Sequence, residues 1–391
     1  MLDRFPFLNR PSRAPLRPGA HPSLNYRPPF FLTFIKLLFI STVIGVIGVA
    51  AYSLFWFVAA SQLKSQIVVW IDARRAEGMT VEFADYEIKG YPDSLRLVLE
   101  KPALAVPGAA RPWAWRADLA VATVRPWWWG RVKVSMPGQH WATVTLNGRT
   151  QTFAGAARRL DADLGISDGR IKAIAVDLAG IDFKDSKTGD TLLIDQARVS
   201  LKDLKDSPPD YNASAIDLQI AAQELRVPPS LIRPYRLPLG NRIARLEVEA
   251  GIMGEIPAGP WPSALAPWRD KGGTVEFKQL DVTYGELAMF SNGTLSLDGA
   301  LQPIAAFTAR VQGFIETVDT LRKQGIIHGR DAIAAKLILG ALAKKSEPDG
   351  TLTVSLPLTL QERQLFAGPV LLGRVPEVRW SGDPTQPSPT P

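Results

Sequence analysis

The stretch Leu246-Glu247-Val248-Glu249-Ala250 alternates apolar and polar side chains residue by residue, and this pattern decides the fold of most of the chain. Successive side chains of a β-strand point to opposite faces, so the alternation predicts strands with one apolar face. The same alternation recurs at Leu95-Leu97-Leu99, Leu280-Val282-Tyr284, Phe307-Ala309-Val311 and Leu352-Val354-Leu356. Short spacings between these stretches favour antiparallel pairing. The sequence therefore predicts a mainly β fold (α+β) with a long, mostly antiparallel sheet.

Helical patterns are few in the same part of the chain. They occur near residues 314–325 and 330–345, with a weaker helical turn near residues 154–160. These helices are too few to cover the apolar faces of about fifteen strands, and an apolar sheet face must be covered by something. Two arrangements remain open. Either two sheets pack on each other as a self-covered core, or one long curved sheet holds an apolar groove for another molecule.

The uncharged run Leu37–Ala60 predicts a membrane anchor. A helix over its 24 residues is about 36 Å long, enough to cross a hydrocarbon core of about 30 Å. Residues 58–60 resemble a signal-peptidase site, but a signal peptide needs only about 7–15 apolar residues. We therefore expect an uncleaved transmembrane helix within residues 30–60, continued by a juxtamembrane helix over residues 61–78.

Basic residues on the two sides of this run predict its orientation. Close to the run the count is a tie, with three basic residues on each side. Residues 1–36 as a whole hold six basic residues and one acidic residue, and cytoplasmic segments are rich in lysine and arginine. We expect a single-pass protein of a bacterial inner membrane, with a cytoplasmic N-terminus and residues 61–391 in the periplasm.

Proline-rich stretches indicate the domain organisation. Residues 1–29 contain seven prolines and are expected to form a disordered, basic tail, and residues 384–391 a second disordered tail. The stretch Asp206–Tyr211 contains two adjacent prolines. It is the predicted seam between a β-rich half over residues 79–206 and a second half over residues 212–383.

The charge distribution argues against a nucleic-acid partner. The 391 residues carry a net charge of +7, but the residues after Lys36 contain 39 basic and 37 acidic side chains. Nucleic-acid binding requires a basic patch or stripe on the folded part, which is here nearly neutral. The absence of cysteine excludes a disulfide scaffold, thiol catalysis and a cysteine-based zinc site.

Catalytic motifs are also missing. The three histidines, His21, His140 and His328, are far apart, and the chain has no HExxH, GxSxG, P-loop or GxGxxG. Ser61–Lys64 and Lys187–Gly189 match the SxxK and KTG motifs of penicillin-recognising enzymes. However, Ser61 adjoins the membrane helix and no Ser-x-Asn lies between the two motifs. The sequence predicts no cofactor and no metal site, and it favours a protein without enzyme activity; a hydrolase that acts on envelope polymers is a third interpretation.

Tryptophan is concentrated in one region of the chain. Six of the eleven tryptophans lie between residues 113 and 141, and the candidate contact residues among them are Trp113, Trp115, Trp127, Trp128 and Trp129. One interpretation is a membrane-interface contact or the rim of an apolar ligand site, because indole is an apolar body with one polar N–H. The others are packing on both faces of a covered strand, with Arg125 and Arg131 stacking nearby, and sugar stacking.

A turn at Gly90-Tyr91-Pro92 is predicted between strands that end at Ile88 and start at Leu95. Glycine there supplies a positive φ, and proline fixes φ near −65°. The segment around this turn, Tyr86–Leu97, belongs to a series of short sequence segments that carry a family resemblance. The others follow in order along the chain: Pro112–Ala117, Gly272–Val275, Leu295–Asp298 and Gly368–Pro376. In these pieces the chain resembles, over about residues 62–378, an uncharacterised alphaproteobacterial family of membrane-anchored envelope proteins with a Gly-aromatic-Pro turn.

The resemblance implies an architecture rather than an activity. Many members carry a cysteine on each strand beside the turn, near Phe83 and Leu99, and this chain has none. The architecture is similar to that of AsmA-type envelope proteins, which anchor by one helix and present a long β-rich groove linked to lipid handling. No catalytic residue can be carried over.

From this resemblance we expect a non-enzymatic envelope protein whose partners are the lipid bilayer and a phospholipid or another envelope lipid, which it binds or guides in envelope maintenance. The alternative is a structural protein with a self-covered β core that binds other envelope proteins.

Overall fold

The computed structural model is mainly β, which confirms the predicted fold class, and its strands form one large antiparallel sheet. The predicted tails and the predicted seam at Asp206–Tyr211 lie outside the described residues, so the division into two halves stays a prediction. The structure describes residues 30–108, 112–146, 149–168, 170–202, 213–229, 239–255, 257, 263–345, 350–368, 370–378 and 380.

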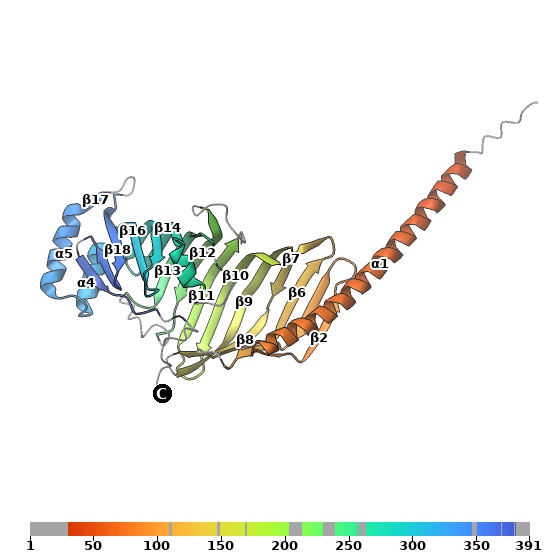
Figure 1. Ribbon diagram of the computed structural model, residues 1–391, viewed down its shortest axis with the longest axis horizontal. Coiled ribbons are helices and arrows are strands. Elements are labelled where there is room, and N and C mark those ends of the chain that lie inside the picture. The colour runs from red at the N-terminus through yellow and green to blue at the C-terminus, as the bar shows by residue number, and fades with distance from the viewer. Residues whose placement is uncertain are drawn as a thin grey trace, which may run out of the picture. The chain divides into compact units, whose positions relative to one another are not determined.

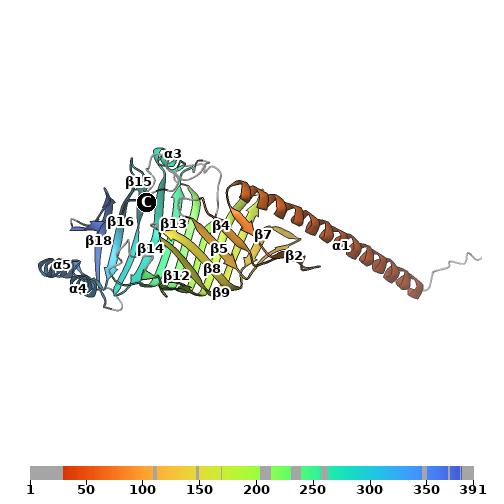
Figure 2. The same ribbon diagram turned by 90° about the horizontal axis from the view of Figure 1, so that it is seen from below.

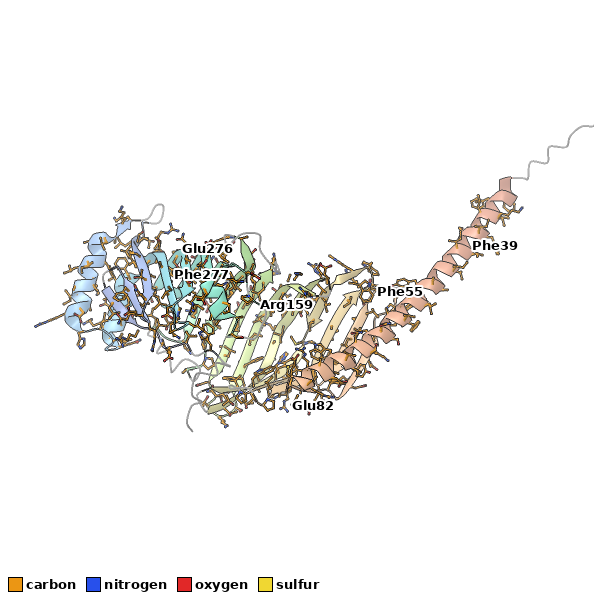
Figure 3. All side chains as sticks on the ribbon, in the orientation of Figure 1. Phe39, Phe55, Glu82, Arg159, Glu276 and Phe277 are labelled. Atoms are coloured by element: carbon orange, nitrogen blue, oxygen red, sulfur yellow. The ribbon has the colours of Figure 1, made fainter. Side chains whose placement is uncertain are left out.

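Helix α1 spans Phe30–Ala76 and joins the predicted transmembrane and juxtamembrane segments without a break. By length and composition it can cross a membrane, which supports the prediction of one N-terminal span. Figure 3 shows Phe39 and Phe55 projecting from this helix. The residues up to Phe55 belong to one compact unit, and those from Trp56 onward form a second unit that contains the sheet.

The first ten strands form the N-terminal part of the sheet (Figure 1). Their bounds are β1 Thr80–Glu82, β2 Asp85–Lys89, β3 Leu95–Glu100, β4 Ala103–Val106, β5 Trp113–Ala117, β6 Leu119–Arg125, β7 Trp128–Ser135, β8 Gly138–Leu146, β9 Arg149–Ser167 and β10 Arg170–Asp185. The expected helical turn near residues 154–160 is wrong, because these residues lie within β9. Ladders with neighbouring strands on both edges outweigh the helix propensity of its alanines.

The remaining elements continue the sheet towards the C-terminus. The strands are β11 Thr191–Lys202, β12 Ser214–Arg226, β13 Arg242–Met253, β14 Thr274–Tyr284, β15 Leu287–Leu297, β16 Pro303–Gln312, β17 Lys344–Lys345, β18 Leu352–Gln361, β19 Gln364–Ala367 and β20 Val370–Arg374. The helices are α3 Leu265–Asp270, α4 Phe314–Lys323 and α5 Gly329–Leu342.

The sheet divides at β9. One edge of β9 pairs with β10, whereas the other edge pairs with β8 in its first half and with β7 in its second half. One branch then runs β7, β6, β3, β2, and the other runs β8, β5, β4, β1. In the other direction the strands follow in chain order from β10 to β16 and then β18, β19 and β20 (Figure 2).

The three short helices among the described residues lie at the margins of the sheet. Helix α3 packs with Leu265 and Trp268 on Leu297, at one end of β15. Helix α4 contacts β15, α5 contacts β18, and the two helices contact each other at the C-terminal side of the sheet (Figure 1). Helix α3 also packs on Ile252 of β13 and Val275 of β14, whereas no helix of the described residues makes an extensive contact with β10, β11 or β12.

Candidate functional site

One face of the sheet is apolar from β10 to β18. Residues paired across antiparallel strands share a face, so a row of side chains can be followed from strand to strand. The row through Leu246 crosses eight strands and is apolar throughout: Leu178, Ala197, Ala222, Leu246, Val282, Met289, Val311 and Val354. The next row on this face differs only by one serine: Val176, Val199, Ile220, Val248, Leu280, Ser291, Ala309 and Leu356.

The opposite face is polar in the same strands. The intervening row is Asp177, Arg198, Ala221, Glu247, Asp281, Phe290, Arg310 and Ser355. Neighbouring residues such as Glu276 and Phe277, both labelled in Figure 3, therefore belong to different faces. The alternation seen in the sequence thus becomes two continuous surfaces of opposite character.

The apolar face is only partly shielded from solvent. Of the sixteen residues in its two rows, Ala222, Ser291, Ala309 and Val354 are buried, and the others are half-buried. A second layer packed at core density would bury the large side chains among them. Between β10 and β14, where Ala222 is the one buried residue of the two rows, the described residues therefore leave this face accessible to an apolar ligand. At Leu297 the face is closed by Trp268, whose indole N–H donates to the carbonyl of Met253 at 2.9 Å.

A second feature is the contact between α1 and the predicted turn. The indole N–H of Trp56 donates to the carbonyl of Ser94 at 3.1 Å, and its ring meets Tyr91 edge-on with centroids 5.6 Å apart. Phe57 stacks on Tyr91 at 6.1 Å. Trp56 and Ala60 bury Leu95, the first residue of β3. Through these contacts, the turn and the start of β3 pack against the last residues of the uncharged run, Trp56 to Ala60.

Gly90 adopts the predicted positive φ, at +108°. A Cβ atom there would lie 2.6 Å from the Ser94 carbonyl oxygen, too close for any other residue without movement of the turn. The same carbonyl accepts the Trp56 hydrogen bond. Sequence reasoning found the turn but missed Trp56, Ser94 and Leu95 as its partners; a tryptophan near the end of an apolar run was the available signal.

The three consecutive tryptophans form the tip of the β6–β7 hairpin. Trp127, Trp128 and Trp129 are 62%, 53% and 48% exposed, so they are not packed under a covering layer. The Arg131 guanidinium lies 4.8 Å from the Trp128 ring centroid, as the packing interpretation had suggested. Since Leu95 pairs with Val124, this hairpin tip lies beside the Gly90-Tyr91-Pro92 turn, at the same end of its branch.

The other two candidate tryptophans lie on the other branch, in β5. Trp113 is exposed, whereas Trp115 is half-buried and stacks on His140 with centroids 6.1 Å apart. The structure therefore does not bring Trp113 and Trp115 together with the hairpin tip in one branch.

His140 is the one fully buried histidine of the described chain, and it lies between Trp115 and Phe183. Burial lowers its pKa below the ordinary histidine value, against the opposing effects of the Met136 carbonyl and the Asp118 carboxylate. The neutral ring donates from Nε2 to the Met136 carbonyl at 3.1 Å, and Nδ1 has no partner among the described residues. His140 is therefore a fully buried side chain packed between two aromatic rings.

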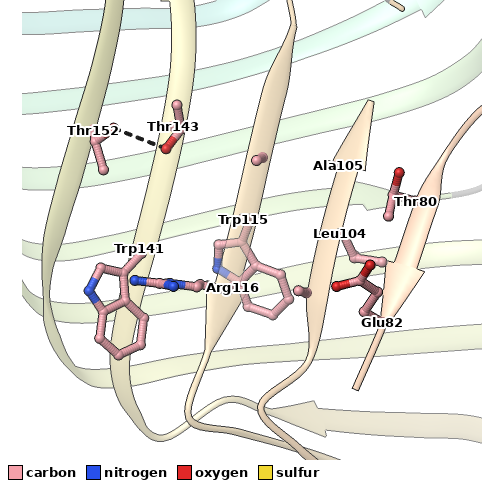
Figure 4. Close-up of a pocket in the computed structure, with 11 residues that line it drawn as sticks. Thr80, Glu82, Leu104, Ala105, Trp115, Arg116, Trp141, Thr143 and Thr152 are labelled. Carbon is pink, nitrogen blue, oxygen red and sulfur yellow. Dashed lines mark hydrogen bonds between the residues drawn. The ribbon is translucent and has the colours of Figure 1, made fainter. Parts of the chain in front are cut away.

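A pocket of about 380 Å³ is lined by residues of the β1–β4–β5–β8 branch and by Thr152 of β9 (Figure 4). Its lining includes the small residues Ala103 and Ala114, and Glu82 and Arg116 lie on opposite sides of it. The Arg116 guanidinium covers the Trp141 ring at 4.6 Å. No histidine lines this pocket, and no cluster of three or more potential metal-binding side chains occurs in the described part of the chain.

The comparison with protein families matches residues 56–376 to a family described as an uncharacterized protein conserved in bacteria (DUF2125). The chain belongs to this family. The matched region begins at Trp56, the residue where the sheet-containing unit begins, so the DUF2125 region includes the part of α1, with Trp56 and Ala60, that packs on β3. No curated protein and no solved structure matches the chain.

Proposed function

We propose that this DUF2125 protein is anchored in the bacterial inner membrane by α1 and binds lipid acyl chains on the apolar face of its sheet, without catalysing a reaction. The observation that carries the proposal is the pair of apolar rows across eight strands, in which twelve of the sixteen side chains are half-buried. Each CH₂ group of a bound acyl chain that is removed from water contributes about 0.8 kcal/mol. A phospholipid or another envelope lipid supplies such chains.

The proposed location follows from charge and sequence pattern. The six basic residues among residues 1–36 favour the cytoplasm, which leaves the sheet on the periplasmic side. The proposal includes the alphaproteobacterial origin and the AsmA-type likeness that the sequence suggested. An AsmA-like protein with one anchor helix and a long β groove would guide lipids during envelope maintenance.

The hairpin tip Trp127-Trp128-Trp129 is proposed to contact the membrane interface. Three features support this role: all three rings are exposed, Arg131 lies over Trp128, and the tip is beside the turn that seats Trp56 and Phe57 at the end of the uncharged run. Tryptophan and tyrosine are enriched at membrane–water interfaces, where indole is partly dehydrated. Trp113 remains a candidate for the same contact from the other branch.

The second candidate function is a structural protein that binds another envelope protein. The observation that favours it is the closed end of the apolar face, where Leu265 and Trp268 of α3 bury Leu297. There the chain covers its own sheet, as a self-covered core would. The two functions predict different contacts for the half-buried rows further along the sheet: lipid acyl chains for the first function, and protein for the second.

Photo-cross-linking of the full chain in its membrane distinguishes them. A photoreactive phenylalanine replaces Val248 or Val282 on the apolar face, and the matched controls carry it at Glu247 or Asp281, the adjacent residues on the polar face. We expect phospholipid adducts, detected by mass spectrometry, at 248 and 282 and none at 247 and 281. Protein adducts instead of lipid adducts at 248 and 282 would establish the second function.

Charge on the apolar face provides the complementary variant. Val248→Glu with Val282→Glu should abolish the lipid adducts at a reporter placed at Leu280 and leave the β content unchanged, because these positions are half-buried. Lipid adducts of equal yield on both faces, or none on either, would contradict the proposal. Leu297 is unsuitable for this purpose, since it is buried against Leu265 and Trp268 and a charge there would disrupt packing.

A further inference from the structure

Helix α5 is oriented with four of its five large apolar side chains towards solvent. Of its inward positions, Ala332 is buried and Ala335, Lys336 and Leu339 are half-buried, and Leu339 is the one large apolar side chain among them. Its outward positions carry Ile333, Leu337, Ile338 and Leu342, all exposed, with Ile333 at 63% and Leu337 at 70%. Consecutive members of this set are four, one and four residues apart, so they form one broad apolar stripe along the helix.

This orientation is the reverse of that expected for a helix on a soluble domain, where the bulky apolar side chains face the core. A continuous exposed stripe of this kind marks an interaction site. The inward side is held by polar contact as much as by packing, because the Lys336 ammonium donates to the Asp319 carboxylate of α4 at 2.6 Å. The stripe is therefore free to contact another surface while α5 stays attached to α4.

The charge around the stripe selects its partner. Between residues 322 and 345 there are six basic side chains, Arg322, Lys323, Arg330, Lys336, Lys344 and Lys345, and one carboxylate, Asp331. Two of the six, Arg322 and Lys336, pair with Asp319 of α4. Lys344 and Lys345 follow the helix directly and are exposed. An apolar stripe with lysine and arginine at its ends matches an anionic bilayer, which receives the apolar side chains at its acyl boundary and the cations at its headgroups.

We propose that the outward face of α5 docks on an anionic lipid bilayer, as a membrane contact separate from α1 and independent of lipid binding on the sheet. Ile333, Leu337, Ile338 and Leu342 enter the interface, and Lys344 and Lys345 bind lipid phosphates. A second copy of this chain or a protein partner would cover the stripe without inserting it among acyl chains, which the test below detects.

The chain has no cysteine, so a single one can carry an environment-sensitive NBD fluorophore. Leu337→Cys places the probe on the stripe, and Ser355→Cys, an exposed residue of β18 on the polar sheet face, is the matched control. The labelled full chain is reconstituted in nanodiscs of phosphatidylcholine and phosphatidylglycerol in equal parts and mixed with vesicles of the same lipids. Parallel samples contain phosphatidylcholine only.

We expect NBD at residue 337 to shift its emission to shorter wavelength in the anionic samples and to be quenched by doxyl-labelled lipid, and NBD at residue 355 to do neither. The shift should be smaller in phosphatidylcholine alone, and smaller again when Lys344→Glu and Lys345→Glu are introduced. A probe at 337 that stays in water would overturn the proposal. So would a shift without doxyl quenching, since that result indicates a protein–protein contact.

Discussion

Helices α4 and α5 follow one another in the chain and contact each other. However, α4 buries its large apolar side chains, whereas α5 exposes most of its own. Helix α4 buries Phe314 and Val318 and turns its charged residues outward, as a helix on a soluble domain does. Helix α5 buries Ala332 and exposes Ile333 and Leu337. The difference teaches that a helical period locates an apolar stripe but not what the stripe contacts. The apolar stripe of α4 is buried against other parts of the chain, whereas that of α5 is exposed to solvent.

The largest expected difference between the two helices concerns truncation of their large side chains. Phe314→Ala removes a buried ring from under α4 and should lower the free energy of unfolding by about 3–5 kcal/mol. Leu337→Ala should change it by no more than about 0.5 kcal/mol, because the side chain is exposed. Urea unfolding of the full chain in nanodiscs, followed by circular dichroism, measures both. Equal losses would mean that α5 is packed against the chain itself.

Glycine substitutions sharpen the same contrast. Gly313 precedes α4 with φ at +68°, and a Cβ atom there would lie 1.8 Å from the Glu286 carbonyl oxygen. Gly313→Ala should therefore destabilise the protein by about 1–3 kcal/mol. Gly340 lies within α5, where nothing is within 4 Å of a Cβ atom, so Gly340→Ala should stabilise it by about 0.5–1 kcal/mol. The two variants should move the unfolding midpoint in opposite directions; a shift of the same sign would show that α5 is not a regular helix at this position.

The smallest expected effect is at the ion pair that joins the helices. The hydrogen bond from Lys336 lowers the pKa of the Asp319 carboxyl below its ordinary value. A carboxyl whose pKa is lower in the folded state stabilises the fold above the unfolded pKa of about 3.9, and this contribution is lost as the pH falls through the folded pKa.

Wild type should consequently lose more of its melting temperature between pH 7 and acidic pH than Lys336→Met does. Both side chains are partly exposed, so the difference should also shrink in high salt. An identical pH profile for the two proteins would show that the contact does not contribute.

Local patterns predicted much of this architecture because they depend on neighbouring residues. The alternation at Leu246–Ala250 became part of β13, and Gly90 has the positive φ that its turn was expected to need. Alternation alone does not report how strands pair, so the division of the sheet at β9 was not predictable. Residues 154–160 read as a helical turn for the same reason: their strand partners in β8 and β10 are remote in sequence.

For the candidate site too, the sequence did not reveal contacts between residues that are distant in the chain. The tryptophan cluster was visible in the sequence, but its division between the exposed β6–β7 tip and the His140 stack on β5 depends on which strands pair. Trp56 was hidden within the uncharged run, and its role became visible only through the Ser94 carbonyl. In each case the deciding partner is a residue distant in the chain.

The sequence by itself determined that the chain has one uncharged span long enough for a membrane, alternating strands, few helices and no cysteine, because these are properties of composition and short-range period. Only the tertiary structure decided that the strands join in one sheet, that its apolar rows stay half-buried, and that α5 points its large side chains outward. Accessibility is the physical reason: whether an apolar side chain is covered depends on what lies across from it, and that is set by contacts between distant segments.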